Sequence, residues 1–402
     1  MLTALDPAFS DGAVSASPLP ASAPRWRWAR PLIEGTLPSP RGGHTATLVD
    51  DRLFIFGGHK YGGAKEGFVY HNDLHVLHLK RNQWLDLPRH KGTAPKPRYG
   101  HSAVLVGKKI VVFGGKGEKG KYFADLHALE TDTLAWYQGP QSQPNAPSPR
   151  FGHSCNLDGT AVYIFGGVQE KDLKNDLHCI NLEDMSWSQP LTNGTPPCPR
   201  FGHAAIIVGQ QLIVCGGMHR VQLEPTPREE LLEKIELKDW YLMDICALDL
   251  TSLTWYRVRT HGCPPPPRFG HSLAAVNEDL VVFGGWAGAK NNVNTVTKDT
   301  SRSKEQLQLQ DEVQTLPPTL LSRFDTTTMT WMECTSVGNA PKTRYGHSCT
   351  QVGSKLILFG GWDASISLND VVVLCDLKDE LYSGSPPVVG PDAVSGVNES
   401  AP

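Results

Sequence analysis

The chain has no long hydrophobic run and no marked excess of charge of either sign. Its 402 residues include 38 Lys and Arg against 41 Asp and Glu, which gives a formal net charge of −3. A basic excess that would attract nucleic acid or an anionic membrane is therefore missing. No apolar stretch approaches the ~18 residues that cross a bilayer. Residues 1–24 contain two aspartates and neither a basic cluster nor an apolar core, so no secretory signal is predicted.

Closely paired cysteines and common catalytic motifs are also missing. None of the nine cysteines forms a CxxC pair, and several, such as Cys215 and Cys375, lie in apolar runs, where a small buried hydrophobe is expected. An odd number without paired spacing argues against a disulfide framework and for a reducing compartment. We therefore expect a cytoplasmic or nuclear protein. GxSxG, P-loop and HExxH motifs do not occur.

What the chain does have is a sixfold internal repeat. The string Arg-x-Gly-His begins at Arg41, Arg98, Arg150, Arg200, Arg268 and Arg344. Each copy leads through an apolar stretch to a glycine pair, at 57–58, 114–115, 166–167, 216–217, 284–285 and 360–361. An aspartate then opens the next apolar run in five units, at Asp73, Asp125, Asp176, Asp244 and Asp370, whereas Leu320 takes this place in the fifth unit. Such a period indicates a repeat architecture.

Each unit predicts four short β-strands. In the second unit the runs are 101–106, 109–115, 125–130 and 134–139. They are rich in β-branched and aromatic residues and are bounded by glycine, proline and polar turns. The first two runs are almost wholly apolar, as is typical of inner strands buried on both faces. The fourth is more polar and fits an outer strand. The glycine pair is expected to end the second strand and turn the chain.

One tryptophan is out of place, and its spacing predicts how the ring closes. Five units end at a tryptophan, but the sixth has none after Val371. Trp28 precedes Arg41 by 13 positions, the same separation as between Trp187 and Arg200. We therefore expect residues 25–33 to form the outermost strand of the last unit, so that the sheet ring leaves no large unpaired edge.

These glycine pairs, tryptophans and Arg-x-Gly-His motifs resemble the kelch-repeat family. The resemblance covers residues 25–378 and implies an all-β fold, a six-bladed β-propeller of four-stranded blades closed by the strand around Trp28. Residues 1–24 and 379–402 are expected to be a disordered leader and tail. No second domain of the BTB, F-box or kinase type is recognisable.

Two insertions interrupt the repeat on what should be one face of the propeller. The first, about 218–242, contains a capping box at Thr226–Glu229 and apolar residues at helical spacing, which predict a short helix near 227–238. The second, about 286–319, is rich in Asn, Thr, Lys, Gln and Ser and is expected to be mobile or disordered.

Positions that differ between units are the better guide to a binding site. The residue after the glycine pair varies, and the candidates are His59, Lys116, Met218, Trp286 and Trp362. The two tryptophans, if exposed, would anchor a partner; equally, they could cover the inner rim of the blades. The lysines near His59 and Lys116 could favour an acidic segment, although solvated surface lysines are the simpler interpretation.

The motif arginines have two interpretations. In some kelch propellers the equivalent arginines grip acidic or C-terminal carboxylates of a bound peptide, which suits a guanidinium fork. The resemblance extends this role to Arg98, Arg150, Arg200, Arg268 and Arg344. The alternative, which we favour, is structural: because the arginine recurs in every unit, it would bond backbone carbonyls between blades.

The resemblance implies a non-catalytic scaffold or adaptor that binds proteins, through an acidic or C-terminal peptide, as a monomer without cofactor. The six motif histidines lie one per blade, too far apart to share a metal ion at ~2 Å. Some kelch proteins are iron-dependent specifier-type lyases with a Glu, an Asp and a His four apart. Here Glu170, Lys174 and His178 replace that set, so the metal motif is not matched. Nucleic-acid binding is disfavoured by the charge.

Overall fold

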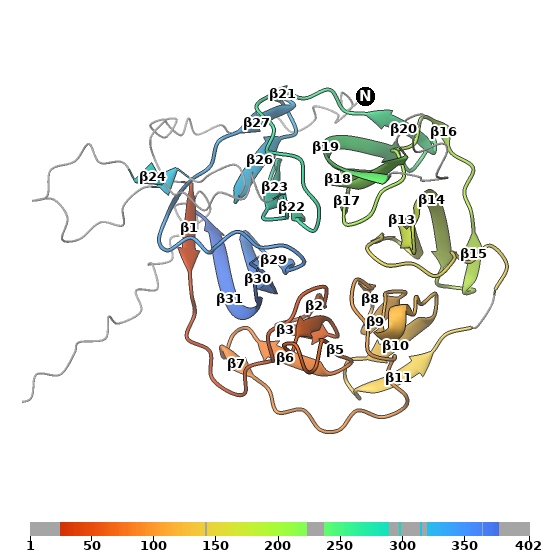
Figure 1. The fold of residues 1–402 in the computed structure, drawn as a ribbon, viewed down its shortest axis with the longest axis vertical. Helices are drawn as coiled ribbons and strands as arrows, with labels where there is room; N and C mark the ends of the chain where they lie inside the picture. Colours follow the sequence, from red (N-terminus) through yellow and green to blue (C-terminus); the bar gives the residue numbers. More distant parts are fainter. Residues whose placement is uncertain are drawn as a thin grey trace, which may run out of the picture.

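Six antiparallel sheets are arranged around a central axis, like the blades of a propeller (Figure 1). The computed structural model describes residues 25–140, 143–222, 237–288, 297–298, 314–315, 320–363 and 365–377. Within these ranges the regular secondary structure is almost entirely β-strand, joined by turns and loops, and a 3-10 turn spans Glu118–Gly120. The predicted all-β, six-bladed β-propeller is confirmed.

The first three blades follow the order of the sequence, each running from the axis outward. Blade 1 contains β2 (Thr45–Val49), β3 (Arg52–Phe56), β6 (Leu74–His78) and β7 (Gln83–Trp84). Blade 2 contains β8 (Ser102–Val106), β9 (Lys109–Phe113), β10 (Leu126–Glu130) and β11 (Ala135–Gln138). Blade 3 contains β12 (Ser154–Asp158), β13 (Ala161–Gln169), β14 (Asp172–Asn181) and β15 (Ser186–Ser188).

The other three blades repeat this pattern. Blade 4 contains β17 (Ala204–Val208), β18 (Gln211–Gln222), β19 (Leu237–Asp249) and β20 (Thr254–Arg257). Blade 5 contains β22 (Ser272–Val276), β23 (Asp279–Phe283), β26 (Leu321–Asp325) and β27 (Thr330–Met332). Blade 6 contains β29 (Ser348–Val352), β30 (Lys355–Trp362), β31 (Ser367–Asp376) and β1 (Trp26–Ala29).

The N-terminal strand closes the ring, as the spacing of Trp28 predicts. β1 pairs antiparallel with β31, so that Trp28 lies opposite Leu374 (Figure 1). Arg25 fixes this closure by ion pairs with Asp376, at 3.0 Å, and with Asp279 of the preceding blade. Ends that lie about 350 residues apart in sequence are thus joined in one sheet.

Short additional strands extend several sheets at the outer edge or the rim. β16 (Asn193–Gly194), β21 (His261–Gly262) and β28 (Thr335–Val337) run parallel to the outermost strands of blades 4, 5 and 6. β24 (Thr297–Lys298) and β25 (Gln314–Thr315) continue from β28. A separate hairpin in blade 1 consists of β4 (His59–Tyr61) and β5 (Phe68–Tyr70). The sequence patterns do not predict any of these strands.

Adjacent blades are held together by pairs of aromatic rings. The tryptophan of a blade packs on the phenylalanine that precedes the glycine pair of the blade before it, and ring centroids lie 4.9–5.6 Å apart in the pairs Trp136–Phe56, Trp187–Phe113, Trp255–Phe165, Trp28–Phe283 and Trp84–Phe359. In blade 4, Cys215 takes the place of the phenylalanine and joins Trp331 in the same core cluster. Aromatic contacts of this kind add to the burial of apolar area.

The glycine pairs do more than end a strand. In blades 3, 4 and 6 the second strand continues through the pair as a β-bulge, as between Phe165 and Gly167. The expected strand end is therefore wrong for these blades. Both glycines have positive φ, +66° at Gly114 and +101° at Gly115. A Cβ at Gly115 would lie 2.9 Å from Cβ of His101, so both conformation and space require glycine.

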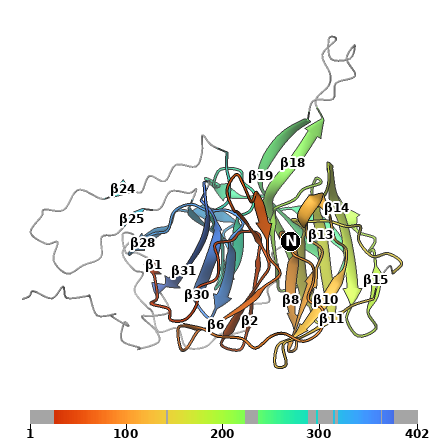
Figure 2. The same ribbon diagram turned by 60° about the horizontal axis from the view of Figure 1, so that its bottom comes forward.

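The first insertion forms an arm. β18 and β19 extend together beyond the blade, pairing as far as Gln222 with Leu237, and rise from one face of the propeller (Figure 2). Of the helix expected near 227–238, residues 227–236 lie outside the described residues, and 237–238 belong to β19. Most of the second insertion, 286–319, also lies outside them. Among the described residues, no helix is long and apolar enough to cross a membrane.

Candidate binding site at the propeller axis

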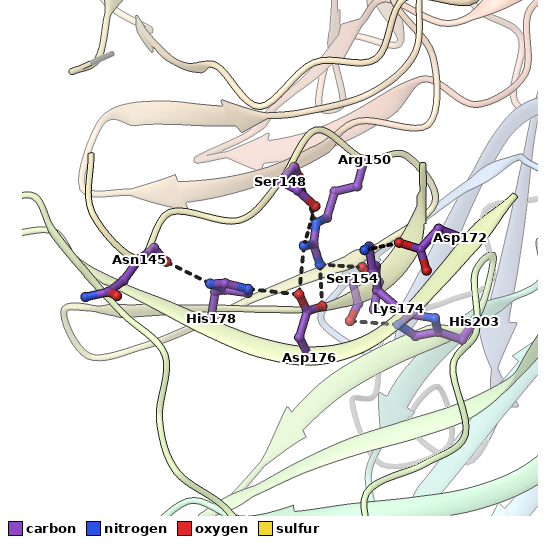
Figure 3. Close-up of polar contacts among 10 residues, drawn as sticks. Asn145, Ser148, Arg150, Ser154, Asp172, Lys174, Asp176, His178 and His203 are labelled. Atoms are coloured by element: carbon purple, nitrogen blue, oxygen red, sulfur yellow. Dashed lines mark hydrogen bonds and ion pairs between the residues drawn. The ribbon is translucent and has the colours of Figure 1, made fainter. Parts of the chain in front are cut away.

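Each motif arginine is held inside its blade. Arg150 donates a hydrogen bond from Nη1 to the carbonyl of Gly166 at 2.9 Å. It also forms a bidentate salt bridge with Asp176, from Nη1 to Oδ1 at 2.6 Å and from Nη2 to Oδ2 at 2.9 Å (Figure 3). Its Nε donates to the carbonyl of Ser148, and His178 shares a further hydrogen bond with Asp176 at 3.0 Å. Burial alone would raise the pKa of Asp176, but Arg150 and His178 outweigh it and lower that pKa below its usual range.

The same network recurs around the ring. Paired arginines and aspartates are Arg41–Asp73, Arg98–Asp125, Arg200–Asp244 and Arg344–Asp370. Arg268 belongs to the fifth unit, in which Leu320 replaces the aspartate. It donates hydrogen bonds to the carbonyls of Pro266 and Gly284, and burial lowers its pKa to about 10. The candidate arginines Arg98, Arg150, Arg200, Arg268 and Arg344 are 0–3 % exposed. This geometry agrees with the structural interpretation and adds a partner, the repeated aspartate, that the sequence analysis did not connect to the arginine.

The motif histidines form a second ring of contacts between blades. Nε2 of His153 shares a hydrogen bond with the Ser102 hydroxyl of the preceding blade, at 2.8 Å. Four other histidines repeat this bond with Ser or Thr, namely His44, His101, His203 and His347. At His271 the position is occupied by Ala204, and Nε2 has no hydrogen-bond partner within the described residues. Burial lowers the pKa of His44, His153 and His271 to about 3.

A closed ring of backbone hydrogen bonds surrounds the axis. The glycine of each Arg-x-Gly-His motif donates its N–H to the same glycine of the preceding blade, at 2.7–2.8 Å, through Gly43, Gly100, Gly152, Gly202, Gly270 and Gly346. Their φ angles are +60° to +66°. A Cβ at Gly100 would lie 2.9 Å from the Phe151 ring. The third position of the motif is therefore glycine in all six blades, and the six N–H groups are occupied.

The second position of the motif builds an aromatic cup beside this glycine ring. Its side chains come from five blades, Tyr99, Phe151, Phe201, Phe269 and Tyr345. Neighbouring rings have centroids 5.4–6.0 Å apart and planes tilted by 48–54°. The cup has a volume of about 500 Å³. The repeat of an aromatic residue before the motif glycine was a visible signal for these residues, but the sequence analysis did not assign them a role.

Blade 1 completes the cup in a different way. Its motif has Gly42 in place of the aromatic residue, and a Cβ there would lie 2.2 Å from Cδ1 of Trp362. The Trp362 indole therefore fills the position, with His59 beside it at 5.3 Å between ring centroids. His59 also packs on Tyr99 at 4.1 Å. Burial lowers the pKa of His59 to about 4.

The candidate residues after the glycine pairs all pair with the second position of the motif. Backbone bridges join Gly42–His59, Tyr99–Lys116, Phe201–Met218, Phe269–Trp286 and Tyr345–Trp362. Of these candidates, His59 and Trp362 line the cup. Of the two alternatives for the tryptophans, burial favours a cover of the inner rim, because Trp362 is 8 % exposed and Trp286 is half-buried against Tyr345. Met218 is buried, and Lys116 is half-buried.

Exposed apolar side chains gather on the same face as the cup. Tyr61 and Phe68, on the β4–β5 hairpin, are 52 % and 53 % exposed and line the edge of the cup. Trp240 lies exposed on the arm, and Ile366 on the loop between β30 and β31. Large apolar side chains left in contact with water are a common feature of interaction surfaces. No sequence pattern pointed to any of these four side chains.

No cluster of three or more His, Cys, Asp or Glu that could hold a metal ion occurs within the described residues. At the string compared with the specifier lyases, Lys174 forms an ion pair with Asp172, and His178 is buried against Asp176 (Figure 3). These side chains make contacts within blade 3. Lys174 occupies the position of the aspartate in the Glu, Asp and His set of the specifier lyases.

Comparison with known proteins agrees with this architecture. The family described as the KLHDC2/KLHL20/DRC7 Kelch-repeats domain matches residues 60–285, and the Kelch motif matches residues 343–380. The chain is 30% identical over 380 residues to human host cell factor 2, which covers 85% of this chain and 42% of that protein. It is 27% identical over 355 residues to human Kelch domain-containing protein 3, with 84% and 82% covered.

Human host cell factor 1 is 29% identical over 371 residues, covering 87% of this chain. The chain spans only 17% of the length of that relative. The similarity therefore concerns the propeller and not the remainder of that much longer protein. The matched family covers more than half of the residues, and the six motifs occupy equivalent positions in six blades. This chain belongs to the kelch-repeat family of β-propeller proteins.

Proposed function

We propose that this protein is a non-catalytic scaffold or adaptor that binds a segment of a partner protein on the face containing the aromatic cup. The observation that carries this proposal is the cup itself, which collects aromatic side chains from all six blades and has exposed Tyr61 and Phe68 at its edge. Tyrosine, tryptophan and phenylalanine are enriched in the cores of protein interfaces.

The cup does not resemble a catalytic centre. Among the described residues that line it, the titratable side chains are one histidine and three tyrosines, and burial keeps His59 uncharged near neutral pH. A general acid and base with a positioned nucleophile would need a different set of groups. Binding is therefore the function that this site supports best.

The chemistry of the bound segment depends on which cationic side chains of this face it can reach. An acidic or C-terminal peptide gripped by the motif arginines would have to reach side chains that are 0–3 % exposed and already paired. Lys60 and Lys116 are the more accessible cations on this face. Candidate contacts for the partner are therefore His59, Lys116, Trp286 and Trp362, together with Tyr61 and Phe68.

The test is affinity capture from cell extract with mass spectrometry. A Tyr61→Ser/Phe68→Ser variant changes two exposed side chains of the cup face and should lose specific partners. The matched control, Tyr137→Ser/Leu191→Ser, changes two exposed apolar side chains outside the cup and should retain them. Both variants must unfold at the wild-type temperature. Loss of the partners only in the control variant would place binding elsewhere and contradict the proposal.

A further inference from the structure

The cup is aromatic on almost every side but offers few hydrogen-bonding groups. Its floor is the glycine ring, in which all six N–H groups already donate to neighbouring carbonyls. Nδ1 of His59 bonds to the carbonyl of Gly42 at 3.1 Å. A carboxylate placed here would lose its water and gain only the few hydroxyl donors of the tyrosines and Ser365. A ligand group without strong hydrogen-bonding requirements fits this cavity better.

The spacing of the rings sets their distance from the axis. In a six-membered ring of points the distance to the centre equals the distance between neighbours. Centroids of the five motif aromatics are 5.4–6.0 Å from the next, and in a regular six-membered ring with this spacing a group on the axis would lie about as far from each centroid. A cation is attracted to an aromatic face within ≈ 6 Å of its centroid. One cation at the centre would reach several rings at once.

The chain itself places an ammonium group on one of these rings. Nζ of Lys116 lies 5.5 Å from the centroid of Phe151 and 4.9 Å from that of Tyr122. Asp363, the residue after Trp362, has a side chain that is 12 % exposed and forms an ion pair with Lys342 at 3.9 Å. Burial first, and then this carboxylate, raise the pKa of Tyr345. No charged side chain lines the cup among the described residues.

We propose that the cup binds the quaternary ammonium group of a trimethylated lysine in the partner protein. This ligand is positively charged, carries no N–H donor and is weakly hydrated, so an aromatic cavity with few acceptors suits it. An unmodified lysine brings three N–H donors that the cup does not satisfy. The inference rests on the proposed function and specifies its ligand.

The test compares three capped pentapeptides that differ at one side chain. Each peptide has two glycines before and two glycines after its central residue. The central residue is trimethyl-lysine, unmodified lysine or the neutral carbon isostere of trimethyl-lysine. Binding to the full chain is followed by saturation-transfer NMR and titration. We expect the trimethyl-lysine peptide to bind on the order of ten-fold more tightly than the isostere. Equal binding of the isostere would overturn the inference, because apolar burial alone would then explain it.

Three single-residue variants test whether the preference for the charged peptide arises in the cup. Phe201→Leu keeps an apolar side chain but removes one aromatic face, and it should weaken trimethyl-lysine binding more than isostere binding. Tyr137→Leu, on the outer strand β11, is the matched control and should change neither. Lys116→Gln removes the chain's own cation and should strengthen only the charged peptide. Weaker binding of that peptide to Lys116→Gln would contradict the inference.

The peptide series and the capture experiment separate the two proposals. If the peptides show no preference for the charged form while partner capture still depends on Tyr61 and Phe68, the cation inference fails and the binding face stands. If capture does not depend on these residues but the charged peptide binds the cup, the cup is a ligand site and the wider protein-binding face is wrong.

Discussion

The ring of buried histidines predicts that this propeller loses stability at mildly acidic pH. All six motif histidines are buried, and burial is the first cause that lowers their pKa values, to about 3 at His44, His153 and His271 and well below the usual range at His101, His203 and His347. In the unfolded chain their pKa values are near 6.5. The unfolded state therefore binds more protons as the pH falls below 7, and folding is penalised.

The size of this effect follows from proton linkage. A histidine that stays uncharged in the fold and ionises with a pKa near 6.5 on unfolding costs about 1.3 kcal/mol between pH 7 and pH 5.5. Six such groups cost about 7–8 kcal/mol, which is comparable to the whole stability of a typical domain. The aspartates paired with the arginines do not offset this change, because their lowered pKa values affect stability only below about pH 5.

The assay is urea unfolding followed by tryptophan fluorescence at pH 7.0, 6.5, 6.0 and 5.5. The free energy of unfolding should fall steadily across this range. His271→Asn should reduce this fall in the free energy of unfolding by about one sixth, because it removes one of the six buried histidines. His271 suits this test because its Nε2 has no hydrogen bond to a neighbouring hydroxyl that the substitution would break. His90→Asn, at an exposed histidine, should leave the fall unchanged. A free energy of unfolding that varies by less than about 1 kcal/mol between pH 7 and 5.5 would refute the reasoning.

Three further predictions concern stability, each measured by urea unfolding at pH 7. Ala204→Ser supplies the hydroxyl that His271 lacks and should stabilise the protein by about 1 kcal/mol; no gain would contradict the proposed bond. Asp176→Asn leaves the buried Arg150 with a neutral partner and should cost about 2–3 kcal/mol; an effect below about 0.5 kcal/mol would show that the pair contributes little. Trp28→Ala removes a buried side chain packed on Phe283 and should cost about 3–5 kcal/mol. A wild-type midpoint for this variant would contradict closure by β1.

The location of the candidate site was harder to predict than the fold. Varying residues after the glycine pairs pointed to the face that contains the cup, but Trp362 is buried because Gly42 leaves space that its indole fills. The aromatic residue in the motif was visible as a pattern, yet a pattern along the chain does not say that five such rings meet at one axis. The hairpin with Tyr61 and Phe68 was hidden in a loop rich in glycine and lysine.

By itself, the sequence determined the architecture of this protein. Six copies of a motif, each with its glycine pair and tryptophan, specify six similar sheets, and the displaced Trp28 specifies how they close, because every unit must bury the same apolar strands against a neighbour. Only the tertiary structure decided which repeated residues are available to a partner. Arg150 and four of its equivalents turn inward and meet an aspartate 26 or more residues away, and Arg268 turns inward to a backbone carbonyl. The aromatic rings converge because the glycine ring draws all six motifs to the axis. Both results depend on contacts between separate parts of the chain, which local sequence patterns do not record.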